Sequence, residues 1–383
     1  MKNLLDKIST PYNPRLIAFS IFFILLIFGI LHTTTWFLYT KTILFPKSDK
    51  IIGDLVRLSC EIDSANPRAV TYTLNKKHIQ GHQYKNQKID ILTIGDSFSN
   101  GGGGGENRFY QDYIESIHNK RVLNIPPADI SLNKIEMIVA MYNNGLLDKI
   151  KPKIIILESI ERFIVQDFAK KINWEYLISK KTMLNDMKSN IYNPNLEKEN
   201  NSTDIIPNFI SIINSRNYDC IINPIYYKYG REPIDRNNLV YKFSLSKNMF
   251  SAQAQDKLLF LKQTIITSMN NNLENIKKVN NNISKLAKLL KKKNIKLIFM
   301  PIPDRYNLYS SYIIDNPFPE DNFFKLLRKL KKNYYFIDTK AILQNILETR
   351  KDIFHSDDTH WTHVASEEII KNVNFENILD NNL

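Results

Sequence analysis

The stretch Ile91-Leu92-Thr93-Ile94-Gly95-Asp96-Ser97-Phe98-Ser99-Asn100 decides the interpretation of this sequence, and five glycines, Gly101 to Gly105, follow it directly. Its apolar first part is typical of a buried strand, which the Gly-Asp-Ser turn brings to an end. The turn would present the Ser97 hydroxyl at the carboxyl end of the strand, where open α/β sheets bind their ligands. Because a serine hydroxyl is barely ionised at neutral pH, Ser97 needs a neighbouring base to act as a nucleophile.

A base for Ser97 occurs near the end of the chain, in Asp357-Asp358-Thr359-His360-Trp361-Thr362. An aspartate close to a histidine can accept a hydrogen bond from Nδ1 of the ring and leave Nε2 facing the serine hydroxyl. This segment follows the last predicted strand and precedes a final helix, so it can reach the same sheet edge as Ser97. These residues therefore predict a catalytic triad of Ser97, His360 and Asp358.

The glycine run after Ser97 has two interpretations. The chain has only 11 glycines, and five of them are in this run. Without Cβ atoms, several N–H groups could approach an oxyanion or a sugar closely. The alternative is a flexible insert in the loop after the nucleophile.

The composition limits the class of partner. With 52 Lys and Arg against 39 Asp and Glu, the net charge is +13, which favours lipid headgroups, an acidic polysaccharide or nucleic acid. A biased base composition explains the same excess equally well. No basic stretch is interleaved with stacking aromatic residues, so we predict no nucleic-acid partner.

The cysteines and histidines predict neither a metal site nor a cofactor. Cys60 and Cys220 lack zinc-type spacing, and they could form one disulfide in an oxidising compartment or stay as two buried thiols. His355, His360 and His363 with the nearby aspartates also fit no standard zinc pattern.

An apolar segment near the N-terminus, Leu16 to Leu38, is long enough to cross a membrane, which takes about 20 residues. It is longer than the apolar region of a usual signal peptide, and no small-residue cleavage site follows it. We therefore expect residues 1–40 to form a cytoplasmic tip and an uncleaved transmembrane anchor. Lysine and arginine flank both ends about equally, so charge does not decide the orientation.

From Ile89 onward, apolar runs alternate with amphipathic stretches. The predicted strands are Ile89–Ile94, Arg121–Ile125, Lys153–Leu157, Lys296–Met300 and Tyr334–Ile337, and the predicted helices are Arg108–His118, Leu132–Asn143, Leu258–Lys292, Asp321–Lys331, Lys340–Glu348 and Val364–Val373. This alternation predicts a flavodoxin-like, three-layer α/β/α domain at residues 88–383 with about five parallel strands in the order 2-1-3-4-5. Residues 41–87 would form a connector that includes a short helix around Ile51 to Ile62, and about 165–257 an insertion, because that stretch is too long for a loop. Asn193–Thr203 is rich in Asn, Glu and Lys, and we expect it to be mobile.

An early Gly95-Asp96-Ser97 with a late Asp/His pair resembles the SGNH/GDSL hydrolase superfamily. The motif Asp358-Thr359-His360-Trp361-Thr362 is most similar to that of the alginate O-acetyltransferase type of the superfamily. The stretches Ile154–Arg162 and Phe299–Tyr309 also resemble segments of this type. The resemblance covers about residues 88–165 and 290–375, and it implies that Ser97 is the nucleophile, His360 the general base and Asp358 the residue that orients it.

The sequence departs from the family pattern in three ways. Alginate-type enzymes generally place Asp-x-His before the serine, whereas here the serine comes first, as in ordinary SGNH hydrolases. In those hydrolases the acid lies three residues before the histidine, which makes Asp357 the alternative triad acid. The usual oxyanion residues have no clear counterpart, so Asn124 and the glycine run, represented by Gly101, are the candidates.

Two further residues are candidate substrate contacts, Arg162 and Trp361. Arg162 could bind a carboxylate or an acyl oxygen. The alternative for this arginine is a structural ion pair with Glu158 or Glu161.

The resemblance implies a membrane-anchored serine O-acyltransferase that O-acetylates a cell-envelope or extracellular polysaccharide, acidic or neutral, through an acyl-serine intermediate. It implies an acyl donor supplied by a membrane-bound O-acyltransferase. It also implies a single-pass protein of the inner (cytoplasmic) membrane whose catalytic domain faces the periplasm. The alternatives are a carbohydrate esterase (deacetylase) with the same fold and an inactive protein that binds or assembles glycans.

Overall fold

The computed structural model describes residues 13–44, 51–66, 68, 72–127, 133–188, 212–229 and 240–380. Its centre is a six-stranded parallel sheet in the order β1-β3-β2-β4-β7-β8. The strands are β1 (Ile79–Gln80), β2 (Ile91–Ile94), β3 (Val122–Asn124), β4 (Ile154–Ile160), β7 (Lys296–Ile302) and β8 (Tyr335–Phe336). The five predicted strands and their order are confirmed, and the two-residue strand β1 is added at the edge beside β3.

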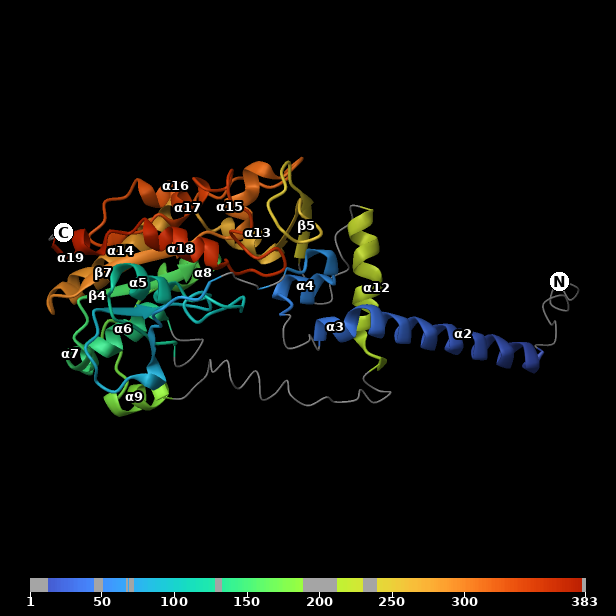
Figure 1. Cartoon of the computed structure of the whole chain (residues 1–383), viewed down its shortest axis with the longest axis horizontal. Helices are drawn as coiled ribbons and strands as arrows, with labels where there is room; N and C mark the ends of the chain where they lie inside the picture. The colour runs from blue at the N-terminus through green and yellow to red at the C-terminus, as the bar shows by residue number, and fades with distance from the viewer. Residues whose placement is uncertain are drawn as a thin grey trace, which may run out of the picture.

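Helices cover both faces of this sheet, so the three-layer α/β/α fold is confirmed (Figure 1). One face carries α5 (Tyr110–His118), α17 (Thr339–Gln344) and α18 (His363–Lys371); the other carries α6 (Lys134–Asn143), α8 (Glu161–Phe168), α14 (Leu273–Lys291) and α16 (Phe323–Arg328). Along β4, Ile155 and Leu157 point into one core and Ile154 and Ile156 into the other, because strand side chains alternate between faces. β4 is buried at every position, as expected for a central parallel strand.

The remaining described α-helices connect or flank this framework. They are α4 (Asp54–Ser59), α7 (Leu146–Ile150), α9 (Lys180–Lys188), α12 (Ser215–Lys228), α13 (Lys262–Ser268), α15 (Arg305–Tyr309) and α19 (Phe375–Asp380). The predicted mobile segment Asn193–Thr203 and the predicted cytoplasmic tip before residue 13 lie outside the described residues.

The prediction of one long helix over Leu258–Lys292 is wrong. Its first residues form β6 (Lys257–Leu261), which pairs antiparallel with β5 (Val240–Ser244) in a separate two-stranded sheet. After α13, a new helix, α14, begins at Leu273, and the Asn272 side chain caps it by accepting the N–H of Asn275 at 3.0 Å. A short apolar run does not distinguish a strand from a helix, and an asparagine favours a helix start over a helix interior.

The N-terminal apolar segment forms a continuous helical stretch that extends away from the α/β domain (Figure 1). It consists of α2 (Pro14–Thr35), the π-helical turn η1 (Trp36–Thr40) and α3 (Lys41–Leu44). The 30 residues Pro14–Ile43 are long and apolar enough to cross a membrane, and the apolar stretch is not buried against the rest of the protein. This is consistent with the predicted single-pass anchor.

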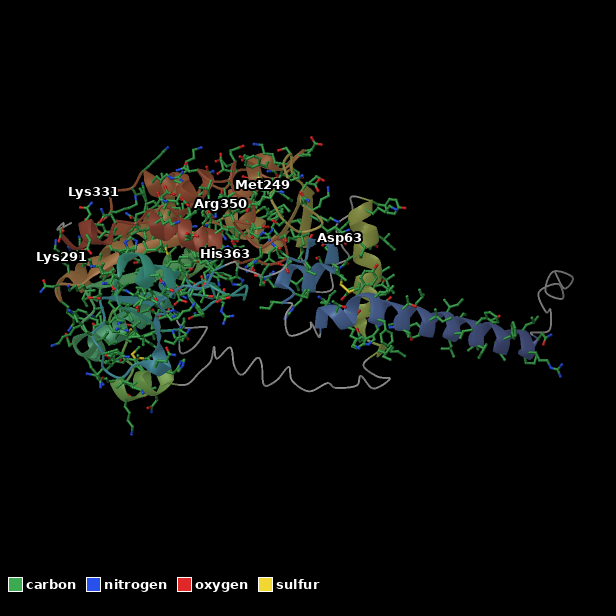
Figure 2. All side chains as sticks on the ribbon, viewed as in Figure 1. Asp63, Met249, Lys291, Lys331, Arg350 and His363 are labelled. Atoms are coloured by element: carbon green, nitrogen blue, oxygen red, sulfur yellow. A yellow bond between two sulfur atoms is a disulfide. The ribbon has the colours of Figure 1, made fainter. Side chains whose placement is uncertain are left out.

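Helix α12 crosses the end of α2 near the domain (Figure 1). The Asn217 side chain on α12 donates to the carbonyl oxygen of His32 at 3.2 Å and lies 3.1 Å from its ring Nδ1. Cys220 of α12 forms a disulfide with Cys60 beside α4 (Figure 2). The structure thus selects the disulfide from the two states that the sequence left open.

Candidate active site

The structure brings Ser97, His360 and Asp358 together at the carboxyl end of β2. The Ser97 Oγ lies 2.6 Å from Nε2 of His360, and Nδ1 of His360 lies 2.6 Å from Oδ1 of Asp358. The same Asp358 oxygen accepts the backbone N–H of His360 at 3.0 Å, which fixes the carboxylate beside the ring. An imidazole held between a carboxylate and a hydroxyl can take the hydroxyl proton, so this arrangement can generate a serine nucleophile.

Asp357, the alternative acid, faces away from the imidazole. Its carboxylate accepts the backbone N–H of Gly53 at 3.0 Å and binds Nη1 of Arg68 at 2.8 Å. It is fully buried among these partners. The geometry therefore favours Asp358 as the residue that orients His360.

The turn that carries Ser97 is held by the neighbouring strand β4. One carboxyl oxygen of Glu158 accepts the backbone N–H groups of Asp96 and Ser99 at 3.1 and 3.2 Å. The Ser99 hydroxyl donates to the same oxygen at 2.7 Å. A Cβ on Gly95 would lie 2.1 Å from this oxygen, so the glycine of the Gly-Asp-Ser turn is required for the contact.

The two acids under this turn have opposite pKa shifts. Burial, together with the nearby Asp96 carboxylate, raises the pKa of Glu158 well above its usual value. Burial by itself would raise the pKa of Asp96 too, but the Lys134 ammonium and the N–H of Ile160 hold it below its usual value. The opposite pKa shifts favour the neutral form of Glu158 and the charged form of Asp96, which reduces the negative charge beside the Ser97 turn.

The glycine run packs against His360. A Cβ on Gly102 would lie only 2.2 Å from Nε2 of His360, and the Gly102 N–H donates to the carbonyl oxygen of Ser97 at 2.7 Å. Gly101, Gly103, Gly104 and Gly105 all have positive φ, which glycine adopts without strain. Close approach to His360 is thus one reason for glycine here.

Two backbone N–H groups near Ser97 are candidate oxyanion donors. In the described part of the chain the backbone N–H of Ser97 is not donated to another protein atom. The backbone N–H of Gly101 has no such acceptor there either. Both amides are therefore available to a negatively charged oxygen.

The other predicted contacts are engaged elsewhere. Asn124 lies buried beneath the Ser97 loop, where its amide donates to Asn100 at 2.9 Å and its oxygen accepts from Thr93 at 2.8 Å. The Trp361 ring is 3% exposed and packs edge-on against Phe98, with the ring centroids 5.2 Å apart. Both side chains support the loops of the site from within the core.

Arg162 forms an ion pair, but neither of the alternative partners predicted for it is the one observed. Its Nη1 binds Oδ1 of Asp304 at 2.6 Å, and its backbone N–H donates to the other oxygen at 3.0 Å. Glu161 instead accepts the amide of Asn307 and the N–H of Asp304, and Glu158 holds the Ser97 turn. Asp304 begins α15 after β7, so residues distant in sequence meet at the carboxyl ends of β4 and β7.

Charges around His360 set its protonation. Burial lowers the pKa of His360, whereas the Asp358 carboxylate raises it through its charge and its hydrogen bond. The Asp54 carboxylate also raises this pKa. Together these effects place the pKa of His360 above the usual 6.5. Burial would raise the pKa of Asp358, but His360 and Arg68 hold it well below its usual value. The carboxylate therefore stays ionised and stabilises the imidazolium that forms when His360 accepts a proton.

Residues of the predicted connector hold the Asp-Thr-His segment. The Asp54 carboxylate accepts the N–H of Thr359 at 2.8 Å and its hydroxyl at 2.6 Å, while the Asp54 N–H donates to Asp358 at 3.2 Å. The next two N–H groups of α4 donate to the carbonyl oxygen of Asp357 at 3.0 and 3.2 Å. A Cβ on Gly53 would lie 2.1 Å from that same carbonyl oxygen.

Arg68 of the connector contacts both the Asp357-Asp358 segment and the glycine run. Its guanidinium binds Asp357 at 2.8 Å, lies 3.8 Å from Asp358, and donates to the carbonyl oxygen of Gly103 at 2.7 Å. Sequence reasoning missed Asp54 and Arg68. The one available signal was Gly53-Asp54 before a short amphipathic run, a pattern typical of a helix start.

Asp54, Asp358 and His360 offer three ligand-type atoms within 4.8 Å of one another. Each of these side chains already has a hydrogen-bond partner in the network around Thr359 and Ser97. We interpret the group as part of the triad and its support rather than as a metal site.

The fold is a three-layer α/β/α domain in which Ser97, His360 and Asp358 are in contact at the carboxyl edge of the sheet. Residues 252–373 match the family model described as the SGNH hydrolase-like domain of acetyltransferase AlgX, which confirms the resemblance to the alginate O-acetyltransferase type. The match covers less than half of the chain, and it includes His360 and Asp358 but not Ser97. Searches of curated proteins and of solved structures gave no significant match.

Proposed function

We propose that this protein is a membrane-anchored serine O-acyltransferase that O-acetylates a cell-envelope or extracellular polysaccharide. The observation that carries the proposal is the continuous contact from Asp358 through His360 to Ser97, with 2.6 Å at each step. The match to an acetyltransferase domain supports acyl transfer as the reaction class.

The geometry supports a two-step mechanism. In the first step, Nε2 of His360 takes the Ser97 proton while Oγ attacks the carbonyl carbon of the acyl donor, and the N–H of Ser97 faces the resulting oxyanion. The intermediate collapses when the bond to the leaving group breaks and His360 returns the proton to that group, which leaves an acyl-Ser97 ester. In the second step, His360 deprotonates a sugar hydroxyl that attacks the ester, and the proton then returns to Ser97.

The proposed location is the inner membrane, with the catalytic domain in the periplasm. The helix from Pro14 to Ile43 would serve as the anchor. The disulfide between Cys60 and Cys220 lies on the domain side of that helix, and disulfides persist in oxidising compartments. The disulfide therefore supports an extracytoplasmic location of the domain, whereas the charges that flank the anchor do not decide its orientation.

The proposed partners follow from the same chemistry. The net charge of +13 suits an acidic polysaccharide, although a neutral one is compatible with the site. A domain held at the membrane surface could accept its acyl group from a membrane-bound O-acyltransferase.

A carbohydrate esterase is the second candidate function. Ser97 precedes Asp358 and His360 in the chain, which is the order of ordinary SGNH hydrolases. The His360 side chain is 13% exposed, so water can reach the acyl-enzyme. Transferase and esterase differ only in which hydroxyl accepts the acyl group from Ser97.

The test begins with a fluorophosphonate probe on the full-length protein in detergent. We expect labelling of the wild type and none of Ser97→Ala, and an absence of labelling with polysaccharide binding retained would instead support an inactive glycan-binding protein. The acceptor is then identified with an activated acetyl ester and a panel of polysaccharides. If acetyl passes only to water with every acceptor, the transferase proposal fails and the esterase replaces it.

A further inference from the structure

Helix α12 carries an apolar stripe of exposed and half-buried side chains. We define the α12 stripe as Tyr218, Ile222, Ile225 and Tyr229, the last being the C-cap residue. Tyr218 is 43% exposed, Ile225 49% and Tyr229 70%. The spacing of four, three and four residues places these side chains on one side of a helix with about 3.6 residues per turn.

The opposite side of α12 faces the protein. At roughly 100° per residue, Cys220 lies on the side of the helix opposite the stripe. Cys220 is bonded to Cys60, and the Tyr227 hydroxyl donates to the carbonyl oxygen of Val240 at 2.6 Å. The α12 stripe therefore faces away from the α/β domain.

The position of α12 relative to α2 indicates what the α12 stripe contacts. Helix α12 lies crosswise at the domain end of α2, and α2 extends from there away from the domain (Figure 1). If α2 crosses a bilayer, a helix that lies crosswise at its end follows the membrane surface. The side of α12 that faces away from the domain is then the side that faces the lipid.

We propose that α12 is an interfacial helix that lies on the bilayer surface with its stripe at the level of the lipid headgroups. Tyrosine suits this depth because its ring is apolar and its hydroxyl is polar, and such helices lie about 5–10 Å into the boundary region. The neighbouring turn η1 exposes Phe37, Leu38 and Tyr39 and continues the apolar surface. Lys228, exposed at the end of α12, suits anionic headgroups.

The consequence concerns the catalytic domain. A single transmembrane helix leaves a domain free to tilt, whereas a second helix on the surface fixes its orientation. The disulfide joins α12 to the end of α4, whose beginning holds Asp357 and Thr359. The triad would thus be held at a constant height above the membrane. This inference rests on the proposed anchoring through α2.

The test uses the full-length chain in nanodiscs of phosphatidylethanolamine and phosphatidylglycerol. An environment-sensitive fluorophore is attached to one introduced cysteine at a time, Ile225→Cys or Tyr229→Cys, while the native cysteines stay in their disulfide. Ile24→Cys on α2, 65% exposed, reports on the anchor, and Ile117→Cys on α5, 42% exposed, is the control on the domain. Quenching is measured with nitroxide-labelled lipids and with aqueous iodide.

We expect probes at positions 24, 225 and 229 to lose most of their emission to nitroxide lipids and little to iodide, and the probe at 117 to show the reverse. Iodide quenching at 225 and 229 together with lipid quenching at 24 would overturn the interfacial helix and leave the anchor intact. An absence of lipid quenching at 24 would overturn the anchor itself. Protection of 225 and 229 from both quenchers would show that a second copy or another protein covers the stripe, which also contradicts the proposal.

Discussion

The two sides of the candidate site are held in different ways. The Ser97 turn is fixed by the sheet itself, because Glu158 at the end of the neighbouring strand β4 accepts three hydrogen bonds from it. The loop with Asp358 and His360 is fixed from outside the sheet, by Gly53, Asp54 and Arg68 of the connector. Ser97 and His360 are thus held by largely different sets of contacts.

This difference shows where the geometry of the site is vulnerable. The central strands are fully buried, so the nucleophile turn is part of the most stable region. The connector has a smaller core of its own and is joined to α12 by the Cys60–Cys220 disulfide. Damage to the connector should misplace the base while the sheet stays folded, and damage under Ser97 should destabilise the sheet as well.

The largest effect is expected for Asp358→Asn. The asparagine amide would disfavour the tautomer of His360 that accepts the serine proton, and the analogous change in other triads lowers turnover by about 10⁴-fold. Asp357→Asn is the matched control, because the same change is made one residue away. We expect that variant to lose far less activity, measured as kcat with an activated acetyl ester. A larger loss for Asp357→Asn than for Asp358→Asn would reverse the assignment of the triad acid.

Glu158→Ala tests the side held by the sheet. It would leave the N–H of Asp96 without an acceptor, at about 1–3 kcal/mol, whereas the N–H of Ser99 would keep the carbonyl oxygen of Asp96 at 3.1 Å. We expect the free energy of unfolding to fall by about 1–3 kcal/mol in denaturant titrations, together with loss of activity. Glu158→Gln keeps an oxygen acceptor and should retain most of the stability, since the raised pKa of the native carboxyl favours its neutral form. Equal stability of Glu158→Ala and wild type would show that β4 does not hold the turn.

Gly53→Ala tests the side held by the connector. The new methyl group would lie 2.1 Å from the carbonyl oxygen of Asp357, and that backbone atom cannot move without moving the loop of His360. A displacement of the base by about 1 Å can cost 10²-fold in rate, so we expect a loss of about that size with little change in the unfolding of the sheet. Gly29→Ala in α2, where no atom lies within 4 Å, is the control. Full activity of Gly53→Ala would mean that the connector does not position His360.

The same contrast explains what could be predicted from the sequence. The strand order follows from alternating apolar runs, and it places Ser97 and His360 at one edge because the carboxyl ends of parallel strands meet there. Asp54 and Arg68 escaped prediction because their contacts with residues 357 and 358 join positions about 300 residues apart with no shared motif. The break between α13 and α14 was missed because Asn270 to Asn272 interrupt an otherwise helical pattern without glycine or proline.

The smallest effect is expected for Asp54→Asn, and it appears in the pH profile. Asp54 contributes to the raised pKa of His360, so removing its charge should lower that pKa. Because His360 must be neutral to act as a base, kcat/KM rises with pH as the imidazolium loses its proton. The acidic limb of the profile should therefore move to lower pH in Asp54→Asn.

Asparagine at position 54 keeps an oxygen for the N–H of Thr359, and its amide can donate to the Thr359 hydroxyl, so the loop should stay in place. Asp63→Asn removes one charge from the same connector at a position that is not among the main causes of the raised pKa of His360 (Figure 2). Its profile should match that of the wild type. An acidic limb that stays in place for Asp54→Asn while kcat falls would assign Asp54 a purely structural role. A limb that moves with kcat retained would show that the connector sets the charge of the base as well as its position.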